Sequence, residues 1–452
     1  MSTMQTLSHS LLRCFAATLA LLAMPPVQAG PKIQHWVADT GARVYFVESR
    51  ALPMVDIQIS FAAGSAYDPA DRAGLAALTR SLLEAGTAKL DEQSIAERSA
   101  DIGAQIGGGT DEDRASLTVR TLSSPAERDA AVALAAELLA APAFPQPVLE
   151  RERARSIAAL REALTRPASL AERSFTSAIF GDHPYGRLST EASLSAITRE
   201  DLLRFHRQHY VAQGASVAIV GDVSRAEAAA LAERLTKNLP AGAPAAALPA
   251  PAQPERRSIR IDHPATQAHL LLGLPGMARQ DLDYFPLLVG NYVLGGGGFV
   301  SRLTREVREK RGYAYSVYSY FSPQRVAGPF QIGLQTRGAQ VADALAVVEQ
   351  TLAEFIAAGP TTEELQAARD NLINGFGLRL DSNRKILDHV AMIGFYQLPL
   401  DWLDTYPQQV AAVTAEAVRD AFARRVRPEH LVTVIVGGSG DAERRPDIGN
   451  AQ

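Results

Sequence analysis

Residues 295–321 read GGGGFVSRLTREVREKRGYAYSVYSYF, and the order of residue types in this stretch decides how the rest of the chain is interpreted. Four glycines open it. Leu303 and Val307, four residues apart in a charged segment, predict a helix with one buried edge. The tyrosine-rich run at 313–320 is typical of a strand. No Gly-Lys-Ser/Thr follows the glycines, so they do not predict a phosphate-binding loop.

Arg308 and Tyr315 lie seven residues apart across the expected bend from helix to strand. Both side chains donate hydrogen bonds, and the arginine keeps its charge. Such a pair suits the binding of the carbonyl groups of an extended peptide. The same residues fit a surface helix stabilised by ion pairs beside a core strand, and composition does not decide between these two interpretations.

Residues 1–29 predict a secretory signal peptide that is not part of the fold. Arg13 precedes an apolar segment at 14–24, and the sequence VQA at 27–29 offers a small-residue cleavage site before Gly30. The apolar segment is too short for a typical membrane span. We therefore expect a secreted protein, located in the periplasm if the cell is Gram-negative.

Cysteine content and charge exclude several classes of protein. Cys14 is the only cysteine and lies within the predicted signal peptide, so the mature chain would have no disulfide, no cysteine ligand for zinc and no thiol nucleophile. With 45 Lys and Arg against 49 Asp and Glu, the formal charge is −4. This mild acidity predicts a soluble protein that binds neither nucleic acid nor membranes.

The chain divides into two similar units. A Pro- and Ala-rich stretch without charges, 240–254, predicts a semi-rigid linker between an N-terminal domain at 30–239 and a C-terminal domain at 255–445. Landmarks repeat at one offset: Asp222 corresponds to Gly438 and Leu149 to Leu365 (438 − 222 = 365 − 149 = 216). A constant offset indicates a duplication.

Periodicity in the first unit predicts both strands and helices. The predicted strands are at 42–48, 55–62, 117–121 and 217–220, and the predicted helices are at 74–85, 94–102, 125–139 and 148–164. A strict alternation of strand and helix is missing. The predicted class is therefore α+β, with two homologous domains that each have helices covering a mainly antiparallel sheet.

An ordered set of short motifs runs through nearly all of the chain after residue 29. The segments are GSAYD at 64–68, GLA at 74–76, LLEAGT at 82–87, GDHPYGR at 181–187, FHRQHY at 205–210, VGD at 220–222 and SRLTREVREKRG at 301–312. In this order they resemble the pitrilysin/insulinase family of zinc peptidases. The resemblance is strongest to a small bacterial branch that pairs as two chains, and it implies that this chain forms half of a clamshell.

The zinc motif of that family does not occur here. The family motif is an inverted H-x-x-E-H, whose histidines bind zinc and whose glutamate activates water, with a further glutamate about 77 residues on. The corresponding positions hold Ala77, Arg80, Ser81 and Ala158. Alanine has no donor atom, serine is a poor zinc ligand, and an arginine adds positive charge where a dication would bind. The resemblance thus implies a chain that has no metal site or cofactor of its own.

The second unit keeps the residues that the family uses to hold substrate. Arg308 and Tyr315 match an arginine and a tyrosine that hold peptide substrate opposite the zinc. The resemblance therefore implies a non-catalytic, substrate-binding subunit of a heterodimeric zinc metalloendopeptidase, whose homologous partner carries H-x-x-E-H and the zinc. The alternative is a structural or binding protein derived from the peptidase fold, with no role in proteolysis. His206 and His209, three residues apart, are expected to pack at a helix end rather than bind metal.

Overall fold

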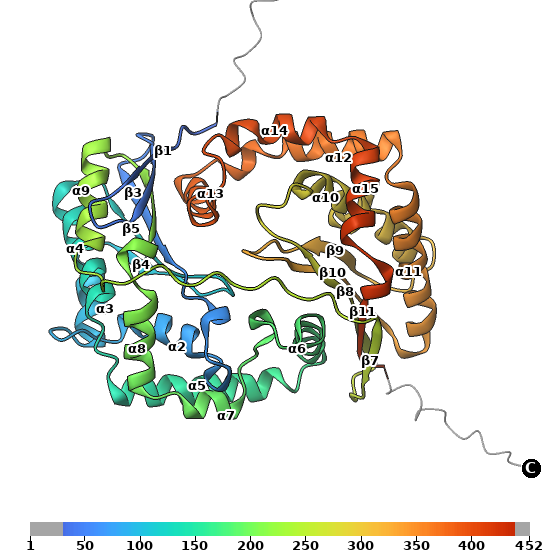
Figure 1. Ribbon diagram of the computed structural model, residues 1–452, viewed down its shortest axis with the longest axis horizontal. Helices are drawn as coiled ribbons and strands as arrows, with labels where there is room; N and C mark the ends of the chain where they lie inside the picture. The colour runs from blue at the N-terminus through green and yellow to red at the C-terminus, as the bar shows by residue number, and fades with distance from the viewer. Residues whose placement is uncertain (1–29, 439–452) are drawn as a thin grey trace, which may run out of the picture.

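The computed structural model describes residues 30–438. The predicted signal peptide, 1–29, and the end of the predicted C-terminal domain, 439–445, lie outside these residues. Below, the N-terminal half means 30–239 and the C-terminal half means 255–438. Figure 1 shows one sheet in each half, with helices between and around the two sheets.

The N-terminal half contains a six-stranded sheet in the order β1-β2-β6-β3-β5-β4. All its pairings are antiparallel except that of β2 with β6. Its central strands are rich in Val, Ile and Thr, which suit a pleated, buried surface. The strands are β1 Gln34–Val37, β2 Arg43–Glu48, β3 Met54–Phe61, β4 Gln105–Gly107, β5 Ala115–Leu122 and β6 Ser216–Gly221.

The C-terminal half repeats this sheet without an equivalent of β1. Its five strands have the order β7-β11-β8-β10-β9, and only the pairing of β7 with β11 is parallel. In each sheet the one parallel pair is followed, in the strand order, by three strands that are joined by antiparallel pairings. This shared arrangement confirms two homologous α+β units. The strands are β7 Arg257–Ile261, β8 Gln267–Met277, β9 Val317–Phe321, β10 Gly328–Arg337 and β11 Val432–Gly437.

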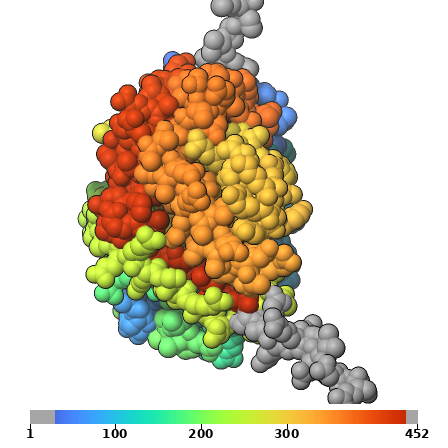
Figure 2. Space-filling model, turned by 90° about the vertical axis from the view of Figure 1, so that its right-hand side faces the viewer, coloured from blue at the N-terminus to red at the C-terminus, as the bar shows by residue number. Residues whose placement is uncertain are grey.

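Helices cover the sheets and connect them. The N-terminal half has α2 Leu75–Ser81, α3 Glu92–Asp101, α4 Pro125–Ala140, α5 Gln146–Ala163, α6 Pro167–Phe180, α7 Glu191–Ala196, α8 Arg199–His209 and α9 Arg225–Thr236. The C-terminal half has α10 Tyr284–Asn291, α11 Val341–Ala358, α12 Thr362–Asn374, α13 Asn383–Tyr396, α14 Trp402–Ala412 and α15 Ala415–Arg425. Figure 2 shows the outer side of the C-terminal half as a closed surface of yellow, orange and red residues. No helix within 30–438 is long and apolar enough to cross a membrane.

The predicted strands and helices of the first unit all form, with one change of detail. The helix predicted at 74–85 is α-helical only to Ser81 and continues as a 3-10 turn over Leu82–Glu84. In the second unit, the strand predicted from residue 313 begins only at Val317. That prediction was wrong for 313–316, which lie between the helix and the strand and are not hydrogen-bonded to β10.

The two halves exchange one helix each. α6 packs on β8 and β11 of the C-terminal half, whereas α13 packs on β2, β3 and β6 of the N-terminal half (Figure 1). Their first residues are 216 apart (383 − 167), and so are their last (396 − 180). Glycines allow close packing in both places: a Cβ at Gly273 would lie 2.9 Å from the Phe175 ring, and one at Gly394 would lie 2.5 Å from the Tyr45 ring. The hydrophobic core of the C-terminal half consequently continues onto the inner face of the first sheet.

A buried carboxylate connects the ends of both exchanged helices. Asp113 is 1% exposed and accepts hydrogen bonds from the hydroxyls of Tyr185, in the turn after α6, and Tyr396, the last residue of α13. It also accepts the backbone N–H of Arg325 at 2.8 Å. Burial and the nearby carboxylate raise the pKa of both tyrosines, so both remain donors. The loop around Asp113 therefore holds the two halves together, because a buried charge requires such partners.

The Pro- and Ala-rich linker is held by histidines from both halves. The Nδ1 atom of His183 accepts the N–H of Tyr185, so its Nε2–H donates to the carbonyl of Pro249 at 2.9 Å. From the C-terminal half, His430 donates to the carbonyl of Pro254 at 2.7 Å. The second part of the linker is thus fixed to the surface at two points.

Candidate functional site

Arg308 and Tyr315 meet at an exposed aromatic surface. The Cζ atom of Arg308 lies 4.9 Å from the centre of the Tyr315 ring and 4.8 Å from that of Phe299. Tyr315 is 84% exposed and Phe299 is 70% exposed. These distances are typical of a cation against aromatic faces. Neither Arg308 nor Tyr315 makes a side-chain hydrogen bond or ion pair with the residues that the structure describes.

The local fold explains how this arrangement arises. Arg308 lies in a π-helical turn, Thr304–Glu309, whose apolar side buries Val307. Such turns are rare and occur often at functional sites. Gly298 and Gly312 flank the turn with φ values of 61° and 62°, a backbone region that favours glycine. The glycine-rich start and the exit to β9 are thereby brought to the same side of the helix.

The other cations of this segment have carboxylate partners. Arg302 contacts Glu364 at 2.6 Å, and Arg305 contacts Glu306 at 3.3 Å. Glu306 also pairs with Lys310 and Arg311, and hydrogen bonds from these partners lower its pKa to about 2. Arg308 is the arginine of this segment whose donors are left available for a ligand.

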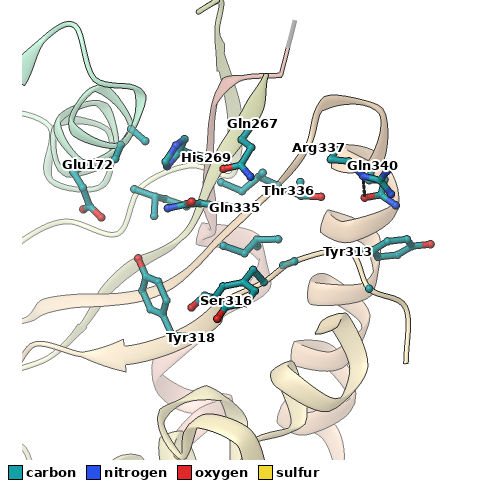
Figure 3. Close-up of a pocket in the computed structure, with 18 residues that line it drawn as sticks. Glu172, Gln267, His269, Tyr313, Ser316, Tyr318, Gln335, Thr336, Arg337 and Gln340 are labelled. Carbon is teal, nitrogen blue, oxygen red and sulfur yellow. Dashed lines mark hydrogen bonds between the residues drawn. The ribbon is translucent and has the colours of Figure 1, made fainter. Parts of the chain in front are cut away.

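A polar cavity of about 300 Å³ adjoins Tyr315. It is formed by the exchanged helix α6, the strands β8, β9 and β10, and the segment at 312–316. In Figure 3, Glu172 and Tyr318 lie on one side of this cavity, and Arg337, Gln340 and Tyr313 lie on the other. The carboxylate of Glu172 accepts a hydrogen bond from Gln331 at 3.0 Å, and burial raises its pKa. The lining offers both donors and acceptors to a polar chain.

The positions of the missing zinc motif lie on neighbouring helices of the N-terminal half. Ala77 and Ser81 are exposed on α2, and Ala158 is exposed on α5, which contacts α2. The hydroxyl of Ser81 donates to the carbonyl of Leu78 at 3.0 Å, a bond within its own helix. None of these three side chains supplies a nitrogen or carboxylate ligand.

Arg80 has a structural role at the fourth position. It is 4% exposed, and its guanidinium donates to Glu84 at 2.9 Å and to the carbonyl of Ser116. A Cβ at Gly108 would lie 2.6 Å from its Nη2, so the arginine fills the space beneath the β4–β5 connection. Zinc ligands are neutral imidazoles, thiolates or carboxylates. The residues present therefore do not fit the zinc of the family, and no group of three or more His, Cys, Asp or Glu within 30–438 is placed to hold a metal ion.

The two histidines of α8 bind backbone carbonyls. Nε2 of His206 lies 2.8 Å from the carbonyl oxygen of Leu139, and Nδ1 of His209 lies 3.2 Å from the carbonyl oxygen of Ala62. Burial lowers the pKa of His206 to about 4 and also lowers that of His209. They pack at the end of a helix, which agrees with the expectation from sequence.

Sequence reasoning missed two parts of this region. No sequence pattern selects Glu172, because α6 was not predicted and its crossing to the other sheet involves residues far along the chain. Asp113 was missed because its partners Tyr185, Arg325 and Tyr396 are distant in sequence. The signal that was present is the offset of 216 residues between α6 and α13.

Comparison with known proteins places this architecture in a family. Residues 43–191 match the model for insulinase, peptidase family M16, and residues 196–372 match the model for the peptidase M16 inactive domain. A crystal structure of a peptidase M16 inactive domain from Pseudomonas fluorescens is 37% identical and has a TM-score of 0.86; the match covers 90% of this chain and 98% of that one. The chain belongs to peptidase family M16. The resemblance seen in the motifs is thereby confirmed.

Relatives within family M16 have differing descriptions. A Helicobacter pylori protein described as a non-peptidase homolog is 26% identical over 428 residues, which cover 93% of this chain and 98% of that protein. An uncharacterized zinc protease of Streptomyces coelicolor is 32% identical over 283 residues, which cover only 60% of either chain. The four replaced motif positions, the matches to the M16 inactive domain and the match to the non-peptidase homolog together support a non-catalytic protein of the M16 fold.

Proposed function

We propose that this chain is the substrate-binding subunit of a heterodimeric zinc metalloendopeptidase that acts on peptides. The observation that carries the proposal is Arg308, whose guanidinium lies between two exposed aromatic rings without any polar partner within residues 30–438. An arginine with no structural ion pair, next to an exposed phenol and a polar cavity, is suited to bind a ligand with accepting groups.

An extended peptide has the required chemistry. Its carbonyl oxygens accept hydrogen bonds, and the guanidinium of Arg308 and the hydroxyl of Tyr315 donate them. The flat ring of Phe299 and the aliphatic part of the arginine give apolar contact to side chains. A peptide can also bind as an added strand, which gives affinity through its backbone.

The partner supplies what this chain lacks. A homologous subunit with H-x-x-E-H would hold the zinc ion, which activates water and polarises the scissile carbonyl. Arg308 and Tyr315 would face that site from the opposite side and donate to the substrate in trans. Export directed by residues 1–29 would place this chain outside the cytoplasm, in the periplasm of a Gram-negative cell, and the partner would have to be in the same compartment.

The test is reconstitution of the two subunits. Each chain is purified alone and then mixed, with complex formation followed by size-exclusion chromatography, zinc by elemental analysis and cleavage by a quenched peptide assay. We expect this chain alone to contain no stoichiometric zinc and to cleave nothing, and the complex to be active. Equal cleavage by the partner with and without this chain would favour the alternative, a structural protein without a role in proteolysis.

A further inference from the structure

The first described residues cross from the N-terminal to the C-terminal half. Ile33 is 8% exposed and belongs to the same hydrophobic core as Trp402 and Leu403 of α14. In Figure 1 the described chain starts beside α14 before it enters β1. A groove of about 920 Å³ lies here, lined by residues 30–32 and by both apolar and polar side chains of the C-terminal half. The start of the chain thus has a defined place on the other half.

Gly30 lies directly against Asp404. A Cβ at Gly30 would lie 2.8 Å from Oδ1 of Asp404 and 3.4 Å from its backbone nitrogen, so only glycine allows this approach without displacement of the carboxylate. The carboxylate of Asp404 makes no hydrogen bond or ion pair with residues 30–438. The other carboxylate of the groove, Asp381, pairs with Lys385 at 2.8 Å. Lys32 is the one cationic side chain of the groove lining.

Cleavage before Gly30 would change the chemistry at this point. While residue 29 is attached, the nitrogen of Gly30 is a neutral amide with one N–H. Hydrolysis adds water across that bond: the carbonyl carbon of Ala29 leaves as a carboxylate, and Gly30 keeps an ammonium group with three N–H donors. The α-nitrogen is bonded, at about 1.5 Å, to the same Cα whose Cβ position lies 2.8 Å from Oδ1 of Asp404. An amino terminus one residue longer would place the charge about 3.5 Å farther along the chain.

We propose that Asp404 is a binding site for the processed amino terminus, which forms an ion pair with the ammonium of Gly30 once residues 1–29 are removed. The pair joins the first residue of the mature N-terminal half to the first turn of α14 in the C-terminal half. It distinguishes a chain cut before Gly30 from one cut elsewhere. The inference rests on the proposed removal of 1–29 and is independent of the role of Arg308 in proteolysis.

The test measures the pKa of the α-amino group, because a carboxylate at the start of a helix also stabilises that helix. The chain is prepared with Gly30 as its first residue and with 13C-glycine, and the Gly30 Cα signal is titrated by NMR. We expect a pKa about half a unit above the ordinary value, as for an exposed ion pair. Asp404→Asn should abolish the shift. Asp401→Asn, one residue before the same helix, is the matched control and should keep it.

Two further measurements test the proposed ion pair between Asp404 and the amino terminus. A chain with one additional alanine before Gly30 should show the ordinary pKa, because its ammonium no longer reaches Asp404. Sequencing of the protein isolated from its host should give Gly30 as the first residue. Equal pKa values in the unmodified chain and in Asp404→Asn would overturn the proposal, and so would an amino terminus at another residue. Reconstituted peptide cleavage is unaffected by either result, so the two proposals fail separately.

Discussion

Arg80 and Arg308 carry the same guanidinium group in two opposite situations. Arg80 is buried in the N-terminal half, where Glu84 and the carbonyl of Ser116 use its donors. Arg308 lies at the surface of the C-terminal half, stacked between two rings and without a polar partner within 30–438. The first arginine stabilises its own half, whereas the second has donors left for another molecule.

This difference shows how a duplicated fold can separate structure from binding. In the N-terminal half, the four positions of the zinc motif have become two alanines, a serine whose hydroxyl is bonded within its helix and a buried arginine. In the C-terminal half, the cations around Arg308 form ion pairs with carboxylates, whereas Arg308 has no carboxylate partner within 30–438. Substitutions at the first place should change stability, and those at the second should change activity.

The largest effect is expected for Arg308→Ala in the reconstituted complex. Loss of a donor to the developing oxyanion should lower turnover by about 10²–10³; if the arginine holds only bound substrate, KM should rise instead. Tyr315→Phe should act in the same direction, and Arg308→Lys should recover only part of the activity because it lacks the planar fork. Arg305→Ala, which removes a paired arginine of the same helix, is the control. Unchanged kinetics in both Arg308→Ala and Tyr315→Phe would make the pair a packing feature.

Asp113→Ala should show how strongly the two halves depend on each other. It removes an acceptor of three hydrogen bonds, and we expect the free energy of unfolding to fall by about 3 kcal/mol. Urea denaturation followed by the fluorescence of Trp36 and Trp402, one in each half, measures the loss. Asp71→Asn, at an exposed ion pair, should stay within about 0.5 kcal/mol of the unmodified chain. Separate transitions of the two halves in the unmodified protein would contradict this view of one interlocked unit.

The pH dependence of stability should report on His206. Its pKa is lowered from 6.5 to about 4 in the folded chain, so only the unfolded chain binds the proton between these values. The contribution of the neutral ring to stability is complete above pH 6.5 and is lost as the pH falls towards 4, by about 3 kcal/mol. His206→Gln should flatten this part of the curve. Parallel curves for His206→Gln and the unmodified chain would show that His206 does not cause the acid sensitivity.

Arg80→Met is expected to lower stability without lowering the activity of the folded complex. It removes two charge-assisted hydrogen bonds in a buried place, at a cost of about 2 kcal/mol. Thermal unfolding and reconstituted cleavage, measured on the same preparation, separate the two effects. A large loss of turnover per assembled complex would mean that the N-terminal half also takes part in the reaction.

The smallest effect is expected for Ser81→Ala. Its hydroxyl is exposed and bonds only within its own helix, so stability should change by less than about 0.5 kcal/mol and cleavage should not change. Calorimetry and the peptide assay provide the measurement. A clear loss of activity here would indicate that a vestige of the motif still has a role.

Local sequence patterns predicted most elements because their causes are local. The alternation of Val55, Ile57 and Ile59 marks β3, and the spacing of apolar residues marks the helices that cover it. The segment at 313–316 defeated this reasoning. Its tyrosines have strand propensity, but the chain there does not pair with β10, although that strand continues for three residues beyond its pairing with β9, and Tyr315 is left in solvent.

The sequence by itself determined the family resemblance, the duplication and the replacement of all four zinc-motif positions, because these depend only on residue types and their spacing. It also determined that Arg308 and Tyr315 are seven residues apart. Only the tertiary structure decided that Arg80 is buried and bonded to Glu84 and Ser116 while Arg308 is stacked on aromatic rings and unpaired within 30–438. It alone decided that α6 packs on the sheet of the C-terminal half and α13 on the sheet of the N-terminal half. The reason is that these outcomes depend on which faces of the two sheets remain to be covered, and residues about 216 positions apart provide the cover.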